Sequence, residues 1–380
     1  MQGFNFHTAS AIRVAPGASL RLAEDCQRLG LIRPLLVTDA GLVALGLIAP
    51  VVDSMADAGV QTSVFDAVTA DPPESVVLSA LEKLNQSDCD GVIAVGGGSS
   101  MDVAKVVAVL ARGRQALSEL YGVDQVQGER LPLILVPTTA GTGSEVTPVA
   151  VITTGETTKA GVSSPVLLPD VAVLDAELTT GLPASITAMT GIDAMVHAIE
   201  AFTSKLKKNP ISDMLAQRAL RLLAGNIRRV LADGNDMPAR EAMLLGSMFA
   251  GQAFANAPVA AVHALAYPLG GHYHIPHGLS NSLMLPTVLH FNSTAVAGQY
   301  AALCNELPGN VSPSANDFIS WFETLISDSG LPATLREAGV AEDMLPTLAS
   351  DAMLQQRLLV NNPVPLSESD ALNLYRRAWG

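Results

Sequence analysis

Cysteine and charged residues are scarce in this chain of 380 residues. Three cysteines, Cys26, Cys89 and Cys304, are too few and too scattered for a disulfide framework or a thiolate metal site. Charged residues make up only 15% of the sequence and apolar residues 49%, a balance that supports a large buried core. The composition therefore excludes a chain that is disordered throughout.

Long hydrophobic runs and positive charge are missing as well. No uninterrupted apolar run approaches the roughly 18 residues needed to span a bilayer, and short runs such as Leu131–Val136 are typical of buried strands. The formal net charge of −14 disfavours binding to nucleic acid or to an anionic membrane surface. The first residues show no basic segment followed by an apolar core, so we expect no secretory signal and a cytoplasmic location.

The first half of the chain alternates short β-type runs with helical stretches. The helical stretches include 73–85 and 100–112, and the strand-like runs are rich in Val and Ile and end at Gly, Pro or Asp: 35–39, 60–65, 90–98, 131–139, 149–154 and 171–175. Strands that are apolar on both faces and alternate with helices predict a parallel sheet covered on both sides. We therefore expect a Rossmann-like α/β domain.

After Pro183 the sequence becomes helical almost everywhere. Segments 184–204, 211–232 and 239–255 are rich in Ala, Leu and Met and show no hairpin signal. The length also favours two domains. We expect an α/β domain over 1–182 and an all-helical domain over 183–380, with a ligand cleft between them.

The strongest local motif of the first half is Gly96-Gly97-Gly98-Ser99-Ser100, between a predicted strand and a predicted helix. Glycines let the backbone approach a ligand closely, and the following helix N-terminus offers free N–H groups to an anion. The motif thus indicates a pyrophosphate site, although its spacing is not that of G-x-G-x-x-G. The alternative is a glycine-rich turn without a ligand.

Two more polar features follow strands that should end at the same sheet edge. The segment 138–145, which contains Thr138, Thr139 and Thr142, has hydroxyls and glycines suited to a dinucleotide. Asp39 ends another strand, where a carboxylate would hold a ribose diol and repel a 2′-phosphate. A capped turn and an ordinary helix cap are the respective alternatives.

A different group of residues occupies the second half. Asp193 and His197 are four residues apart in a strongly helical stretch, so both share one helix face. Five of the seven histidines lie between His197 and His277, among them His263. One carboxylate and three imidazoles form a ligand set suited to Fe(II) or Zn(II). Any one of these residues alone would more often be a satisfied buried polar group.

Four segments resemble the iron-containing, group III alcohol dehydrogenases: GGGSSMDVAK (96–105), TTAGTGSEVT (138–147), GIDAMVHAIEAF (191–202) and HALAYPLGGHYHIPHG (263–278). They occur in the family's order over nearly the whole chain. The resemblance implies a homodimeric oxidoreductase that transfers hydride between NAD and a small alcohol or aldehyde held on Fe(II) or Zn(II). Short primary alcohols, 1,2-diols with their hydroxyaldehydes, and hydroxy acids are the candidate substrates.

The resemblance also assigns individual residues. It implies a metal site of Asp193, His197, His263 and His277, and a cofactor site of Asp39, Gly97, Gly98, Ser99, Thr138, Thr139, Thr142 and Lys159. Several members have a histidine at the position of Tyr267, four residues after the third ligand. Because a phenol titrates near about 10, Tyr267 is a poor base at neutral pH. His272, slightly favoured over His274, is the alternative proton relay, and water is the simplest carrier.

Three rival functions remain. A lyase similar to the dehydroquinate synthases would need a phosphate pocket of Lys and Arg, yet 184–204 and 250–290 contain neither. A maleylacetate-type reductase would not need the complete ligand set that this chain has. A nucleotide-binding module without catalysis is the third alternative.

Overall fold

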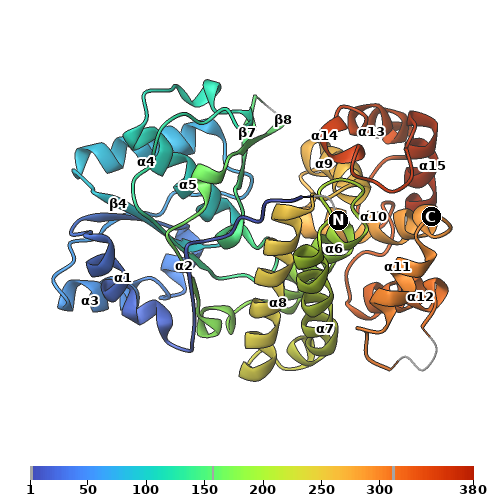
Figure 1. Cartoon of the computed structure of the whole chain (residues 1–380), viewed down its shortest axis with the longest axis horizontal. Helices are drawn as coiled ribbons and strands as arrows, with labels where there is room; N and C mark the ends of the chain where they lie inside the picture. The colour runs from blue at the N-terminus through green and yellow to red at the C-terminus, as the bar shows by residue number, and fades with distance from the viewer. Residues whose placement is uncertain (1–2, 156–157, 310–312) are drawn as a thin grey trace. The chain divides into compact units, whose positions relative to one another are not determined.

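A computed structural model describes residues 3–155, 158–309 and 313–380. The chain forms two compact units (Figure 1). The first, here the sheet unit, comprises His7–Thr139 and Gly143–Thr180. The second, here the helical unit, comprises Gly181–Gly380, the short segment Ala140–Thr142 and residues from the start of the chain. A loop inserted in the sheet unit's sequence thus belongs to the helical unit.

The sheet unit is built on a parallel sheet, as predicted. Among the described residues the sheet has six strands in the order β1-β9-β6-β4-β2-β3, and neighbouring strands pair in parallel. The strands are β1 (Ala11–Val14), β2 (Pro34–Val37), β3 (Ser63–Phe65), β4 (Gly91–Gly96), β6 (Leu133–Pro137) and β9 (Val171–Leu174). The predicted runs overlap five of these strands, and β1 at the sheet edge was missed.

Both faces of this sheet are buried under helices. The helices are α1 (Leu22–Leu29), α2 (Ala40–Ala44), α3 (Ala49–Asp57), α4 (Glu74–Gln86) and α5 (Gly98–Arg112). Along β4, Val92 and Ala94 join a core that includes residues of α4 and α5. The intervening Ile93 and Val95 join a second core with residues of α1 and α3. Because successive strand residues point to opposite faces, each face acquires its own core.

The predicted strand 149–154 exists but lies outside the parallel sheet. It forms a second, three-stranded sheet in the order β5-β8-β7, with bounds β5 (Gly122–Val123), β7 (Val149–Thr154) and β8 (Thr158–Ser163). β7 and β8 pair antiparallel. Short 3₁₀ segments complete the described part: η1 (Ala18–Arg21), η2 (Leu117–Glu119), η3 (Ser144–Val146), η4 (Pro165–Leu167), η5 (Ala176–Thr179) and η6 (Glu342–Met344).

The helical unit is organised around α6 (Ala184–Thr203), which is buried continuously from Gly191 to Thr203. α7 and α8 pack against α6 and against each other, as Figure 1 shows. The remaining helices of the unit are α7 (Pro210–Ala232), α8 (Met237–Asn256), α9 (Ala261–Tyr273), α10 (His277–Asn292), α11 (Ala297–Cys304), α12 (Ala315–Asp328), α13 (Leu345–Ala352), α14 (Gln356–Leu359) and α15 (Glu368–Trp379). The predicted helices correspond closely to α6, α7 and α8.

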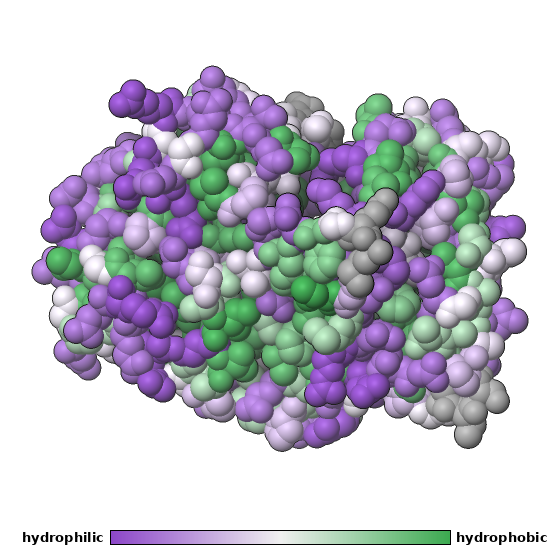
Figure 2. All heavy atoms as spheres, in the orientation of Figure 1, coloured by the Kyte–Doolittle hydropathy of each residue, from purple (hydrophilic) through white to green (hydrophobic). Residues whose placement is uncertain are grey.

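The exposed surface mixes hydrophilic residues with small hydrophobic areas. Figure 2 shows this mixture on the visible face, and single exposed apolar side chains such as Leu45 and Leu354 are ordinary for a protein surface. Of the helices in the described ranges, none combines the length and apolarity that a bilayer crossing requires.

Candidate functional site

Four residues that the sequence singled out come together in the helical unit. Asp193 and His197 come from α6, His263 from α9 and His277 from α10, and one possible ligand atom of each lies within 4.8 Å of all the others. From Asp193 Oδ1, the Nε2 atoms of His197, His263 and His277 are 4.0, 3.9 and 3.7 Å away. One carboxylate oxygen and three imidazole nitrogens thus face a common point, which is the donor set that a divalent transition metal takes.

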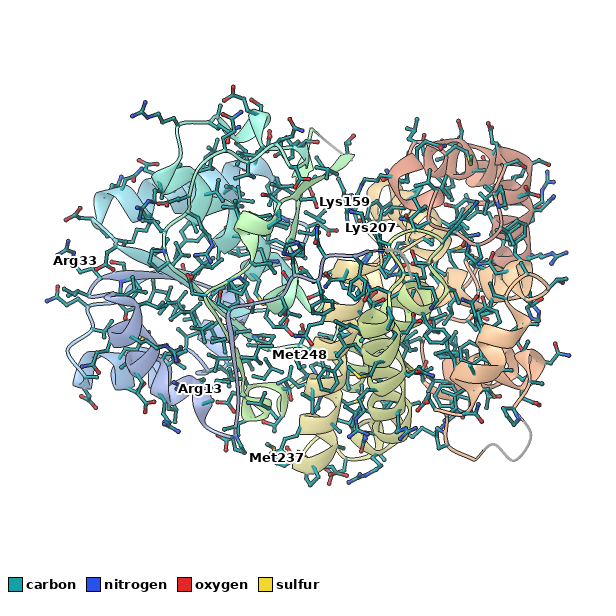
Figure 3. The ribbon with its side chains drawn as sticks, viewed as in Figure 1. Arg13, Arg33, Lys159, Lys207, Met237 and Met248 are labelled. Atoms are coloured by element: carbon teal, nitrogen blue, oxygen red, sulfur yellow. The ribbon has the colours of Figure 1, made fainter. Side chains whose placement is uncertain are left out.

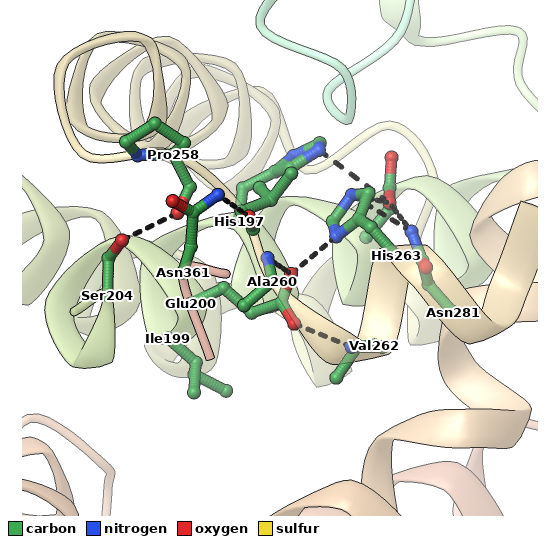
Figure 4. Close-up of polar contacts among 12 residues, drawn as sticks. His197, Ile199, Glu200, Ser204, Pro258, Ala260, Val262, His263, Asn281 and Asn361 are labelled. Carbon is green, nitrogen blue, oxygen red and sulfur yellow. Dashed lines mark hydrogen bonds and ion pairs between the residues drawn. The ribbon is translucent and has the colours of Figure 1, made fainter. Parts of the chain in front are cut away.

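A further residue of α6, Glu200, lies on the same helix face as Asp193 and His197 and holds the cluster in place. Glu200 follows His197 by three residues and is 4% exposed. Its carboxylate accepts hydrogen bonds from the backbone N–H groups of Ala260 (2.8 Å) and Val262 (2.7 Å), and it lies 2.7 Å from His263 Nδ1. Figure 4 shows Glu200 against the first turn of α9. One buried carboxylate therefore fixes both the start of α9 and the ring of His263.

Hydrogen bonds at Nδ1 determine which nitrogen each imidazole offers to the cluster. His197 Nδ1 lies 3.2 Å from the carbonyl oxygen of Gly141, and His263 Nδ1 faces Glu200. Because a carbonyl and a carboxylate accept hydrogen bonds, each Nδ1 carries the proton and each Nε2 keeps a lone pair. Burial also lowers the pKa of His197 to about 3, so its ring is neutral at physiological pH. Neutral rings are the form that binds a metal.

Two glycines allow the backbone to approach α6 closely. A Cβ on Gly141 would lie 2.7 Å from Thr190 Cβ, and a Cβ on Gly278 would overlap the carbonyl of Met189. Gly141 brings its own carbonyl to His197, whereas Gly278 follows His277 directly at the start of α10. The absence of a side chain at these positions therefore sets the separation of the elements that carry the cluster.

Asn281 also reaches into the cluster. It lies one helical turn after His277 and is fully buried, and its Nδ2 is 2.6 Å from Asp193 Oδ1. Burial opposes ionisation of Asp193, but the surrounding imidazoles and the Asn281 hydrogen bond outweigh it and lower the pKa of Asp193 below its ordinary value. Asp193 is therefore an ionised ligand candidate at neutral pH.

The sheet unit gathers most of the predicted cofactor residues at one sheet edge. β2, β4 and β6 are neighbours, and they end directly before Thr38-Asp39, Gly97-Gly98-Ser99 and Thr138-Thr139. A Cβ on Gly97 would lie 3.7 Å from Thr139 Oγ1, so the two loops touch. Gly98 begins helix α5, which is 15 residues long. The first turn of a helix offers backbone N–H groups that have no partner within the helix. This edge has the features of a dinucleotide site.

A buried lysine holds the loop that follows β6. Lys105 Nζ donates to Ser144 Oγ (2.7 Å), Thr147 Oγ1 (3.2 Å) and the carbonyl of Val149 (2.7 Å). Ser144 Oγ in turn donates to Asp102 Oδ1 at 2.7 Å. Burial lowers the pKa of Lys105 to about 8, which still leaves the ammonium form predominant at neutral pH. The polar residues of the second loop motif thus serve partly to tie that loop to α5.

Three other predicted residues have distinct surroundings. Asp39 accepts a hydrogen bond from the backbone N–H of Leu42 at 3.0 Å and caps α2. Lys159, on β8 and labelled in Figure 3, pairs with Asp71 through an Nζ–Oδ1 distance of 2.6 Å. Thr142 belongs to the segment Ala140–Thr142 of the helical unit.

The two proton-relay candidates also differ in their surroundings. Tyr267 lies beside the cluster, with its ring centroid 6.0 Å from that of His277. His272 lies in the last turn of α9, where its Nε2 is 2.6 Å from Asp351 Oδ2. Of these two candidates, Tyr267 is the one whose ring lies against a member of the cluster, whereas the contact of His272 is with Asp351.

Sequence reasoning missed three residues of the site. Glu200 and Asn281 lie three and four residues after His197 and His277, so helical periodicity would have placed them on the same faces. Gly141 was grouped with the nucleotide loop, yet its carbonyl contacts His197. That contact joins residues 56 positions apart, and no local pattern reveals it.

Comparison with known proteins agrees with this geometry. The model for the iron-containing alcohol dehydrogenase family matches residues 9–176, and the model for the C-terminal part of the same family matches residues 187–379. The chain belongs to the iron-containing alcohol dehydrogenase family. Membership makes it an oxidoreductase of the alcohol dehydrogenase class, and it places the chain in a family defined by iron.

Relatives of this iron-containing alcohol dehydrogenase align over nearly its full length. Long-chain-alcohol dehydrogenase 1 of Geobacillus thermodenitrificans (strain NG80-2) is 41% identical over 371 residues, which cover 96% of this chain and 93% of the relative. A crystal structure of a 1,3-propanediol oxidoreductase has a TM-score of 0.96 and 35% identity, with 100% of both chains covered. Sulfoacetaldehyde reductase from Bifidobacterium kashiwanohense, solved with NAD+, has a TM-score of 0.91 and 29% identity, covering 100% of this chain and 99% of that one.

The contacts of Glu200 predict a large loss of stability in Glu200→Ala. The substitution leaves two backbone donors and His263 Nδ1 buried without an acceptor, and we expect the free energy of unfolding to fall by about 3 kcal/mol. Urea unfolding followed by tryptophan fluorescence measures this in the helical unit, because both tryptophans, Trp321 and Trp379, lie there.

Glu323→Ala is the control for Glu200→Ala. Glu323 is an exposed acid that pairs with exposed His290, so its loss should change the free energy of unfolding by less than about 0.5 kcal/mol. Equal losses in the two variants would contradict the anchoring role of Glu200.

Proposed function

We propose that this dehydrogenase oxidises a small alcohol, or reduces the corresponding aldehyde, with NAD and one divalent metal ion. The cluster of Asp193, His197, His263 and His277 carries the proposal, because four ligand atoms within 4.8 Å of one another, three of them on buried residues, suit such an ion. A scan for NADH formation at 340 nm against a panel of alcohols tests it. No absorbance change with any alcohol or aldehyde of the panel would refute it.

The residues fit a metal ion in both number and protonation. His197 and His263 have their Nδ1 protons engaged, which leaves Nε2 of each ring available. Bound there, Fe(II) or Zn(II) would act as a Lewis acid on the alcohol or carbonyl oxygen. We favour Fe(II), since the family is defined by iron, and Zn(II) is the alternative. The chain's own contribution is to hold the four ligand atoms in place.

The edge formed by β2, β4 and β6 fits NAD. We assign the pyrophosphate to Gly97, Gly98 and Ser99 at the N-terminus of α5, and the nucleotide's other contacts to Thr138, Thr139, Thr142 and Lys159. Asp39 would accept hydrogen bonds from the ribose hydroxyls. A relative solved with NAD+ supports this assignment. The nicotinamide supplies the hydride chemistry, and the loops orient it.

The names of the relatives support the proposed substrate class. One acts on long-chain alcohols, another on 1,3-propanediol and a third on sulfoacetaldehyde. The last two compounds carry a terminal hydroxyl or aldehyde group. We therefore place short primary alcohols first in the panel, ahead of 1,2-diols with their hydroxyaldehydes and of hydroxy acids.

Three further assignments belong to the same proposal. The functional domains are 1–182 for the cofactor and 183–380 for the metal, with Ala140–Thr142 contributed to the metal domain. We infer that the protein is a homodimer and that it is cytoplasmic, a reducing compartment in which its three free cysteines would stay reduced. Light scattering on the purified enzyme measures the oligomeric state.

Removal of the metal should abolish turnover. Exhaustive chelation is expected to eliminate NADH formation, and added Fe(II) or Zn(II) should restore it. His263→Ala should retain the fold but lose metal by elemental analysis, because one of four ligand candidates is gone. His290→Ala removes an exposed histidine of α10 outside the cluster and should keep full metal content. Full activity in protein shown to be metal-free would refute the metal assignment.

Asp39 should determine the choice between NAD and NADP. The wild-type enzyme should strongly prefer NAD, because a 2′-phosphate would face a carboxylate at close range. Asp39→Gly should lower the ratio of kcat/KM with NAD to kcat/KM with NADP, mainly by improving the use of NADP. Asp39→Asn removes the charge and keeps an N-cap residue for α2, which separates the two roles. A wild-type enzyme that uses both cofactors equally would show the Asp39 assignment to be wrong.

The proton released by alcohol oxidation tests Tyr267 against His272. Tyr267→Phe should change turnover only a few-fold, because an ordinary phenol stays protonated near neutral pH. If His272 relays protons, His272→Ala should reshape the pH–rate profile near neutrality, and Asp351→Asn should do the same through the ion pair. A large loss in Tyr267→Phe with a silent His272→Ala would assign the role to Tyr267, which lies nearer the cluster.

A further inference from the structure

Asn281 places one side-chain atom among three of the four candidate ligand atoms. Its Nδ2 is 2.6 Å from Asp193 Oδ1 and 3.2 Å from both His263 Nε2 and His277 Nε2. Asn281 is fully buried, and it comes from α10 one helical turn after His277. Figure 4 shows this side chain directed at the cluster.

The opposite end of the same amide has no partner. Asn281 Oδ1 is buried and makes no hydrogen bond within the described part of the chain. A buried carbonyl oxygen without a donor is unfavourable, and such oxygens are rare. A half-turn about the Cβ–Cγ bond exchanges the nitrogen and the oxygen with almost no change in shape. The oxygen would then face Asp193, His263 and His277.

Each orientation suits one state of the cluster. Without an ion, the carboxylate oxygen and the imidazole lone pairs all point to one region and repel one another, and the two N–H groups of the amide relieve that repulsion. With a divalent cation held by the same atoms, N–H groups would point at positive charge, whereas a carboxamide oxygen would attract the ion. The preferred orientation therefore depends on whether the ion is present.

We infer that Asn281 is a two-way positioning residue of the metal centre. Its amide nitrogen holds the ligand atoms of Asp193, His263 and His277 together in the metal-free enzyme, and its oxygen turns toward the ion in the loaded enzyme. This inference rests on the proposed metal site. It adds a residue that keeps the metal-free site assembled and then strengthens metal binding. Asn281 does so with a neutral amide, not with a carboxylate or an imidazole.

Two variants test the two orientations separately. Asn281→Ala removes both ends of the amide, and we expect its affinity for Zn(II) and Co(II), measured by competition with a chromophoric chelator, to fall about ten- to hundredfold. Asn281→Asp keeps the shape and the oxygens but removes the donor and adds charge beside Asp193. We expect this variant to lower the thermal midpoint of the metal-free enzyme by several degrees and to bind Zn(II) at least as tightly as the wild type.

Asn292→Ala provides the matched control. Asn292 ends the same helix, and its side chain and that of Asn362 donate to each other at 3.0 and 2.9 Å. Its loss should lower the thermal midpoint of both metal-free and loaded enzyme and leave the Zn(II) affinity unchanged. This control separates the general effect of losing a buried amide from an effect on the metal centre.

The outcomes distinguish this inference from the proposed function. A wild-type enzyme that binds neither Zn(II), Co(II) nor Fe(II) would overturn both. Wild-type binding together with unchanged or tighter Zn(II) binding in Asn281→Ala would overturn the inference alone. A metal-free Asn281→Asp enzyme as stable as the wild type would also overturn it. Should Asn281→Ala fail to fold, the isosteric Asn281→Asp decides by its opposite effects on metal-free stability and on affinity.

Discussion

The candidate metal site depends on one buried carboxylate, that of Glu200, which is not itself one of the four candidate ligands. Glu200 receives two backbone N–H groups from the start of α9 and faces Nδ1 of His263. The same carboxylate therefore caps a helix that has no side-chain cap of its own and orients the ring that the helix carries. Three hydrogen-bond donors compensate the Glu200 carboxylate for its burial among the apolar residues of α6.

Close packing around α6 turns this anchoring into a defined arrangement of ligands. Asp193, His197 and Glu200 follow one another at intervals of four and three residues, so they share one face of α6. That face presents two candidate ligands, together with the carboxylate that orients a third, His263. Gly141 and Gly278 let a loop and the N-terminus of α10 come within van der Waals distance of that helix. Because interiors are densely packed, a larger side chain at either glycine would displace a ligand rather than fill space.

The sequence predicted the features that depend on residues close together in the chain. The β4 run and the Asp193–His197 spacing were readable because periods of two and of about four residues decide which side chains share a face. The edge strand β1 escaped because half of it is exposed, so its sequence lacks a continuous apolar run. The antiparallel pairing of β7 with β8 and the contact of Gly141 with His197 depend on tertiary packing. Neither follows from spacing or composition.

In the sheet unit, a buried positive charge, that of Lys105, holds a loop in place. Lys105 is fully buried and donates to two hydroxyls and a backbone carbonyl, while Asp102 accepts from the backbone N–H of Val151 at 2.9 Å. These contacts tie the loop after β6 and the strand β7 to α5, the helix that begins at Gly98. A ligand bound at that helix N-terminus thus meets loops whose position is already determined. Glu200 in the helical unit and Lys105 in the sheet unit each bind backbone groups of a neighbouring segment. Because these segments are already ordered, ligand binding costs less conformational entropy.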